Sequence, residues 1–209
     1  MPELGASIIA TRVALLELRD ERRLVQEGYE LLDEKRVMLA AEILRELREH
    51  TACLARTREH EAAARAAFAA AVTIHGFDDL SAAPPCPLDA ALLRRERRSF
   101  LGIGLLEARL DAEPPVPAAP FPLPSPELRA CAIAFREVVG DYVALTAHAG
   151  NLRRLIREYT RTERRARALE NVLLPEIDLS LHFVEDQLDA VDQEEAVRVR
   201  NAARSAPAA

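Results

Sequence analysis

The sequence predicts an all-α fold: a long antiparallel two-helix coiled coil with a proline-rich middle segment that could contain a small β-hairpin. Three observations predict it. Ala, Leu, Arg and Glu, which favour helices, dominate the composition, whereas aromatic residues make up 4% and Trp is absent. Apolar residues recur every seven positions in two long stretches. Most of the 13 prolines lie between these stretches.

The first long helix is expected within residues 1–75. Between Ser7 and His75 there is no proline and a single glycine, Gly28, so nothing in the sequence ends a helix there. A strict seven-residue repeat over this length predicts a left-handed supercoil with a partner helix. The repeat has two lines, one of apolar pairs and one that includes two arginines: Leu18, Leu24–Val25, Leu31–Leu32 and Met38–Leu39, and Leu15, Arg22, Tyr29, Arg36 and Ile43.

The middle segment, residues 76–126, carries the proline clusters PPCP and EPPVPAAPFPLPSP, which exclude helix over most of it. Between the clusters, RRSFLGIGLLEARLD contains Phe100, Gly102 and Gly104 in a short apolar run. This run could form a hairpin, and the rest is expected to be extended, polyproline-like linker.

The second long helix is expected over residues 127–203, followed by a frayed tail at 204–209. Pro175 should bend this helix locally rather than end it, because the apolar repeat continues beyond it. The repeat again has two lines: Phe135, Tyr142, Ala149 and Ile156, and Val138, Leu145, Leu152, Tyr159, Ala166 and Leu173, resuming with Ile177, Val184 and Val191.

Two helices of similar length joined by a turn pair antiparallel, each about 100 Å long at about 1.5 Å per residue. A symmetric fold-back places Leu18 near Val184, Val25 near Ile177 and Leu32 near the stretch around Glu170, with a register defined to within one helical turn.

The charge and the cysteine content indicate the class of protein and the cellular compartment to expect. The formal net charge is −6 with both signs interspersed, as on a solvated helix surface. Cys53, Cys86 and Cys131 lie far apart, which suits a reducing compartment. The N-terminus has no secretion signal, and no apolar run is long enough to cross a bilayer. We therefore expect a cytoplasmic chain that reaches a membrane only through another protein.

No catalytic, cofactor-binding or metal-binding residues are predicted. A phosphate-binding GxxxxGK[ST] loop is absent, and the GxG of LGIGLL is better explained by turn glycines. His60-Glu61 lacks the second histidine of an HExxH zinc motif, and the other histidines share no ligand spacing.

A cluster of arginines is the main electrostatic feature, and three interpretations stay open for it. It could bind nucleic acid, it could be a solvated face balanced by Glu158 and Glu163, or it could make weak, exchangeable contacts with acidic loops of a surrounding ring. The net acidic chain and the acidic stretch 185–195 weigh against nucleic acid. The cluster consists of Arg153, Arg154, Arg157, Arg161, Arg164, Arg165 and Arg167.

Polar residues also fall in the expected seam between the helices. They are either register-setting residues or partner contacts, and the sequence does not separate these interpretations. They are Arg22, Lys35, Arg36 and Glu163.

Two blocks, one in each helix, resemble the family of D subunits of V-type and A-type rotary ATPases. They are ATRVALLELRDERRLVQEGYELLDEKRVML and EYTRTERRARALENVLLPEIDLSLHFVEDQLDAVDQEE. Their signature residues are Thr11, Arg12, Leu31, Leu32, Lys35 and Arg36 in the first block, and Tyr159, Arg161, Arg164, Arg165, Leu169, Glu170 and Pro175 in the second. Ala10, Asp33, Arg167 and Asn171 depart from the family pattern, and in the middle segment Gly102 alone resembles it.

The resemblance implies a non-catalytic central rotor stalk that needs no cofactor. It implies that the paired termini insert into a catalytic hexamer of A and B subunits, that the F subunit clamps the coiled coil, and that the loop end seats on a funnel-shaped subunit above the membrane ring. The stalk would thus be peripheral to the membrane through the ATPase complex. A free-standing coiled-coil scaffold or a nucleic-acid-binding adaptor is the alternative.

Overall fold

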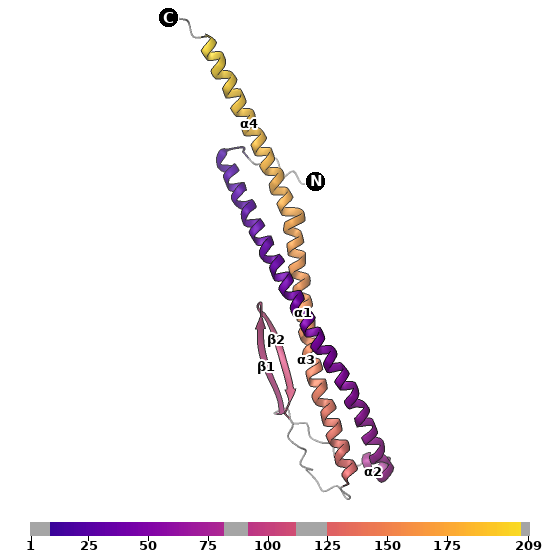
Figure 1. Ribbon diagram of the computed structural model, residues 1–209. Coiled ribbons are helices and arrows are strands. Elements are labelled where there is room, and N and C mark those ends of the chain that lie inside the picture. The colour runs from indigo at the N-terminus through magenta and orange to yellow at the C-terminus, as the bar shows by residue number, and fades with distance from the viewer. Residues whose placement is uncertain (1–8, 82–91, 112–124, 206–209) are drawn as a thin grey trace. The chain divides into compact units, whose positions relative to one another are not determined.

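The computed structural model describes residues 9–81, 92–111 and 125–205 (Figure 1). The predicted fold class, long paired helices with a small hairpin, is confirmed. All prolines of the middle segment except Pro126, together with Cys86 and the end of the tail, lie outside the described residues. In chain order the elements are α1 (Arg12–His75), α2 (Phe77–Ser81), β1 (Leu93–Phe100), β2 (Ile103–Leu110), α3 (Pro126–Ala168), the π-helical turn η3 (Leu169–Leu173) and α4 (Leu174–Ser205).

The chain divides into two compact units, and the long helices α1 and α3 contribute to both. The first unit comprises residues 1–37 and 160–209, and the second comprises residues 38–159. We describe each unit by itself.

Helix α1 runs for 64 residues because its sequence contains no internal helix breaker. Ion pairs one turn apart, such as Arg23–Glu27 and Arg45–Glu49, add modest support along its exposed surface. Gly76, at a φ of 76°, follows the last turn and donates its N–H to the carbonyl of Val72. A glycine in this left-handed conformation is the usual end of an α-helix.

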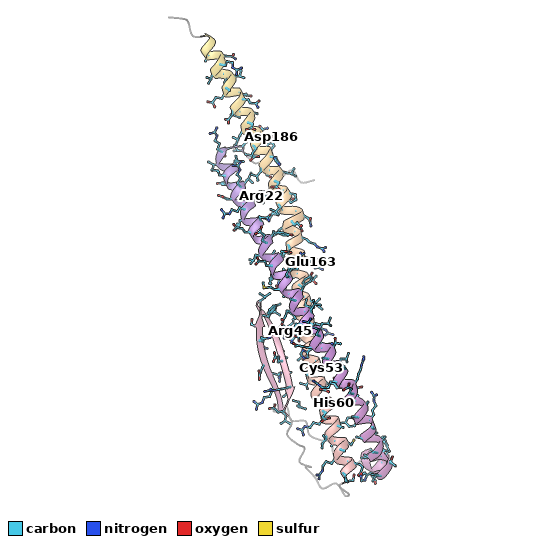
Figure 2. All side chains as sticks on the ribbon, viewed as in Figure 1. Arg22, Arg45, Cys53, His60, Glu163 and Asp186 are labelled. Carbon is cyan, nitrogen blue, oxygen red and sulfur yellow. The ribbon has the colours of Figure 1, made fainter. Side chains whose placement is uncertain are left out.

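In the first unit, α1 and α4 pair in antiparallel orientation, and among the described residues three ion pairs cross between them. Arg12 contacts Asp192 at 3.2 Å, and Arg19 contacts Glu185 at 2.8 Å. Arg22, which Figure 2 labels on α1, contacts Asp178 at 2.6 Å. In each of these pairs the basic partner is on α1 and the acidic partner on α4. The facing of Arg19 and Glu185 agrees with the expected facing of their neighbours Leu18 and Val184.

The C-terminal helical stretch, formed by α3, η3 and α4, continues through Pro175 by means of one wider turn. Proline has no N–H to donate, so a regular α-helix would lose a hydrogen bond at this point. In η3 the N–H of Leu174 instead bonds the carbonyl of Leu169, five residues back. Such a single π turn absorbs the missing donor, and α4 runs on to Ser205.

In the second unit, α1 and α3 are again antiparallel. Asp141 of α3 accepts a 2.8 Å hydrogen bond from Arg56 Nε and lies 2.7 Å from His60 Nδ1. Toward the end of α1, the rings of Phe68 and Phe135 meet edge to face with centroids 6.3 Å apart. α3 begins at a Ser125 cap, whose Oγ accepts from the N–H of Leu128.

The hairpin of β1 and β2 lies in the second unit and is joined by a two-residue turn. Phe100 pairs with Ile103, so Leu101 and Gly102 form the turn, at φ values of 49° and 82°. Positive φ at both central residues is the type I′ geometry that matches the twist of the flanking strands. Glycine adopts it freely, whereas Leu101 adopts it against its preference.

The core of the second unit joins all three elements through the buried leucines Leu39, Leu105 and Leu155, one each from α1, β2 and α3. Around them pack the partly buried side chains of Ile43, Phe100, Ile103 and Tyr159.

The seven-residue repeat is partly wrong in detail. In the apolar pairs of α1 the second residue faces inward and the first faces solvent, as with buried Leu39 beside Met38, which is 43% exposed. On α3 the side chains of the repeat through Phe135, Tyr142 and Ile156 are largely exposed. The buried line of that helix includes polar side chains as well as apolar ones: Val138, Asp141, Asn151, Leu155, Thr162 and Ala166.

Across the described residues, no helix combines the length and the apolar character that a membrane crossing requires.

Candidate functional site

The N-terminal signature block opens the first unit. Thr11 caps α1, because its Oγ1 accepts a 3.0 Å hydrogen bond from the N–H of Ala14. Arg12, the next residue, reaches Asp192 across the helix pair. These two residues therefore set where α1 begins and how it meets α4.

The second part of this block presents one leucine inward and one outward. Leu32 is half-buried, whereas Leu31 is 66% exposed. Arg36, expected in the seam, pairs with Asp33 on its own helix, and Lys35 is half-buried. Leu31 thus lies on the outer surface of α1, away from the side that packs on the second helix.

The C-terminal signature block meets the first block close to its expected partner. Gly28 faces Leu169, whose Cδ1 would lie 3.8 Å from a Cβ built on the glycine. Glu170 lies beside Tyr29, and its charge raises the pKa of the Tyr29 hydroxyl. The symmetric fold-back pairs Glu170 with Leu32 instead, so the observed facing differs from the prediction by about one helical turn. Pro175, the last signature residue, is the second residue of α4.

The arginines of this block are exposed. Arg161, Arg164 and Arg165 form no ion pair with any described residue, whereas Arg167 pairs with Glu163 at 2.7 Å. Glu163 is therefore tied to its own helix rather than across the seam. Tyr159, at the start of the block, packs instead against the leucine core of the second unit.

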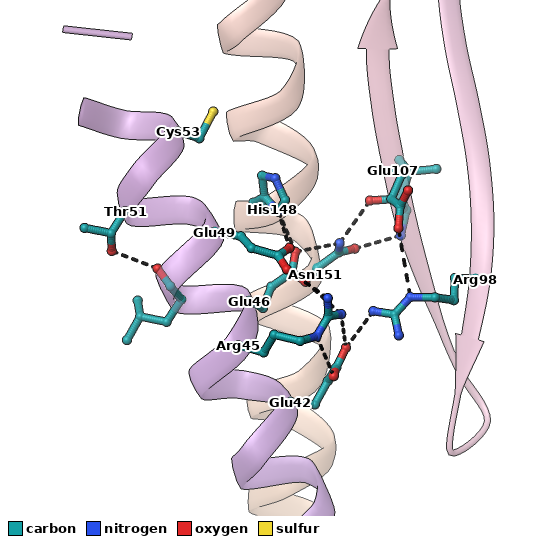
Figure 3. A network of polar contacts seen from close by, with 12 residues as sticks. Glu42, Arg45, Glu46, Glu49, Thr51, Cys53, Arg98, Glu107, His148 and Asn151 are labelled. Atoms are coloured by element: carbon teal, nitrogen blue, oxygen red, sulfur yellow. Dashed lines mark hydrogen bonds and ion pairs between the residues drawn. The ribbon is translucent and has the colours of Figure 1, made fainter. Parts of the chain in front are cut away.

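A buried polar network anchors the hairpin in the second unit, and no sequence signal marks it (Figure 3). The carboxylate of Glu46, which is 2% exposed, accepts a 2.8 Å hydrogen bond from Asn151 Nδ2 and lies 2.7 Å from His148 Nδ1. The same Asn151 side chain bonds both backbone groups of Leu106: it accepts from the N–H at 2.8 Å and donates to the carbonyl at 2.9 Å. Asn151 thus joins α1, α3 and β2.

A second polar contact holds β1. Glu42, 7% exposed, accepts hydrogen bonds of 2.6 Å from both Arg45 and Arg98. The hydrogen bond from Arg45 is the main reason that the pKa of Glu42 falls to about 2, and Arg98 adds to the effect. Glu42 is therefore ionised and links α1 to the hairpin.

One group in this network has the composition of a metal site. Ligand atoms of Glu46, Glu49 and His148 lie within 4.8 Å of one another. The carboxylate of Glu46 already accepts a hydrogen bond from Asn151 and contacts His148. The carboxylate of Glu49 accepts a 2.8 Å hydrogen bond from Arg45. Since hydrogen bonds already engage these carboxylates, the arrangement is accounted for as part of the hairpin anchor.

Long antiparallel helices, a small anchored hairpin and signature residues that lie mostly on helix surfaces define a coiled-coil protein. Comparison with known proteins agrees. The sequence matches the model of the family described as the D subunit of ATP synthase over residues 14–204. This chain belongs to that family, and it is a non-catalytic subunit of a rotary ATPase.

Similar proteins come from bacteria and archaea. The D subunit of the V-type ATP synthase of Thermus thermophilus is 27% identical over 197 residues, which cover 93% of this chain and 87% of the relative. That of Anaeromyxobacter dehalogenans is 32% identical over 198 residues, covering 91% and 92%. The D subunit of the A-type ATP synthase of Thermococcus sibiricus is 26% identical over 193 residues, covering 91% and 90%.

Proposed function

We propose that this chain is the central rotor stalk of its V/A-type ATPase and transmits torque between a catalytic hexamer of A and B subunits and a proton- or sodium-translocating membrane ring. The observation that carries the proposal is the antiparallel helix pairing of the first unit, in which Arg12, Arg19 and Arg22 each form an ion pair across the seam. Two helices fastened to one another resist twisting better than a single helix, as a torque-bearing element must.

The surface of this helix pair suits contacts that have to be made and broken. Arg161, Arg164 and Arg165 are exposed and have no ion pair within the described part of the chain, so acidic loops of a surrounding ring can engage them. Each exposed ion pair contributes little, on the order of 0.2–1 kcal/mol. Weak contacts of this kind let a stalk turn without being held in one position.

Three partners follow from this role: the catalytic hexamer, the F subunit on the coiled coil, and a funnel-shaped subunit above the membrane ring. The first signature block supports the hexamer contact, since Leu31 and the neighbouring Leu24 are 66% and 69% exposed. These two leucines lie seven residues apart, on one face of α1, and neighbouring exposed apolar side chains on one face suit a partner surface.

Co-purification tests the proposal. The tagged chain, isolated from native membranes in mild detergent, should bring the A, B and F subunits in fixed ratio, and adding the purified F subunit to the isolated chain should raise its melting temperature. Recovery of the chain without A and B subunits would contradict the stalk role. Recovery with nucleic acid instead would favour the adaptor alternative.

A further inference from the structure

The two edges of the hairpin differ in how their backbone groups are satisfied. On the edge of β2 that faces the helices, the N–H and the carbonyl of Leu106 both bond the side chain of Asn151. Figure 1 shows β2 lying between β1 and the helices of this unit. Within the described residues, the sheet has two strands and no backbone hydrogen bond leaves the far edge of β1.

The charged side chains on the two faces of β1 differ in whether they form ion pairs. On the face shared with buried Leu105, the charged residues of the strand have partners: Arg94 contacts Asp111 at 2.6 Å, Glu96 contacts Arg109 at 3.7 Å, and Arg98 contacts Glu42 at 2.6 Å.

The opposite face of β1 carries Arg95 and Arg97, which are exposed and form no ion pair with any described residue. Across the strand they face Ala108 and Leu106, and neither strand has an acidic residue on this face. The hairpin therefore presents on one side two positive charges that no described acidic residue compensates.

The backbone groups of the same two residues point to the edge of β1 where no described residue bonds them. In a hairpin with a two-residue turn, the pair that flanks the turn is hydrogen-bonded, and inward and outward backbone groups alternate from there. Phe100–Ile103 is that pair, so Arg97 and Arg95 direct their N–H and carbonyl groups outward. Leu106, opposite Arg97, confirms the alternation, because its outward groups are those that Asn151 binds.

An exposed strand edge pairs with another extended chain, and the side chains beside it select which one. Arg95 and Arg97 are about 7 Å apart on one face, which matches acidic residues at alternate positions of an added strand. A second copy of β1 would set arginine against arginine. The chain's own neighbouring segments 82–91 and 112–124 are rich in proline, which cannot donate to a ladder, and hold a single acidic residue each.

We propose that the outer edge of β1, with Arg95 and Arg97, is a docking strand for an extended acidic segment of a partner protein. Backbone hydrogen bonds supply the pairing and the two guanidinium groups select acidic side chains. A nucleic acid is disfavoured, because the hairpin arginines Arg94, Arg98 and Arg109 are already neutralised. The inference stands apart from the stalk role, which its failure would leave intact.

A labelled, end-capped peptide with alternating Glu and Val is the probe, and fluorescence anisotropy with the full chain is the measurement. Reversing both charges, Arg95→Glu with Arg97→Glu, should weaken binding by at least about tenfold. The matched control is Arg153→Glu with Arg157→Glu, which makes the same charge change at exposed positions of α3 in the same unit. The control should change binding less than about twofold.

A second probe separates strand pairing from simple charge attraction. The same peptide with N-methyl groups on alternate residues keeps its charges but loses the N–H groups of one edge, and it should bind at least about tenfold more weakly. Three results would overturn the proposal: no binding of the parent peptide, equal losses in the two charge-reversed variants, or equal binding of the methylated peptide. Tighter binding of a short single-stranded oligonucleotide would also overturn it.

Discussion

Asn151 Nδ2 of α3 donates a 2.8 Å hydrogen bond to the carboxylate of Glu46 on α1, and each of these residues is 2% exposed. The amide of Asn151 simultaneously satisfies, at Leu106, the edge of β2 that faces the helices. One side chain therefore holds the hairpin against both helices of the second unit.

Asn151→Ala should destabilise the second unit by about 2–3 kcal/mol, because it leaves a buried carboxylate and two backbone groups of Leu106 short of partners. The hairpin amides should lose protection from hydrogen exchange before those of α1 do. Arg153→Ala, at an exposed position two residues away, is the control and should change stability by less than about 0.5 kcal/mol. Unchanged exchange of the hairpin in Asn151→Ala would contradict the anchoring role.

The contacts of Glu42 make stability depend on pH in a defined window. The pKa of Glu42 falls from 4.5 to about 2, first because of its hydrogen bond from Arg45. A carboxyl with a lowered folded-state pKa stabilises the fold above the unfolded value, and this contribution is lost as the pH falls from about 4.5 toward about 2.

We therefore expect Glu42→Gln to lower the urea midpoint at pH 7 and to flatten the fall in stability between about pH 5 and pH 2. The loss at pH 7 should be on the order of 1–3 kcal/mol, since Arg45 and Arg98 are themselves partly exposed. Glu59→Gln, at an exposed position of α1, should leave the profile unchanged. An identical acid profile for Glu42→Gln and the unaltered chain would rule out this contribution.

The turn of the hairpin contains a residue that does not favour its own conformation. Leu101 has a φ of 49°, and the type I′ turn prefers Asn followed by Gly. Leu101→Asn should therefore raise the melting temperature, with a gain of roughly 1 kcal/mol, and Gly102→Ala should lower it by a similar amount. If both substitutions shifted the melting temperature in the same direction, this account of the turn would be wrong.

Much of the fold could be predicted from the sequence, because helix-breaking residues and the seven-residue apolar repeat are local signals. The absence of proline between Ser7 and His75 predicted α1, and the glycines that follow Phe100 indicated the hairpin. The period alone did not separate the two residues of each apolar pair, since Leu31 and Leu32 repeat with the same spacing. Packing against the second helix partly buries Leu32 and leaves Leu31 outside.

The hairpin anchor could not be predicted in the same way. Glu46, His148 and Asn151 are ordinary helix-surface residues by sequence, and they are shielded from solvent because the hairpin packs on the helices at that point. Their partners are long-range contacts, and Leu106 contributes backbone groups that carry no sequence signal.

Crosslinking the exposed arginine face to the catalytic hexamer tests the rotor role most directly. A cleavable, disulfide-containing crosslinker placed at Arg161→Cys in the assembled, cysteine-depleted complex should join the chain to an A or B subunit. ATP hydrolysis should then stop in proportion to the crosslinked fraction and return on reduction, whereas the same cysteine without crosslinker should leave turnover unchanged. Full ATP turnover with complete crosslinking would show that this chain does not turn within the hexamer.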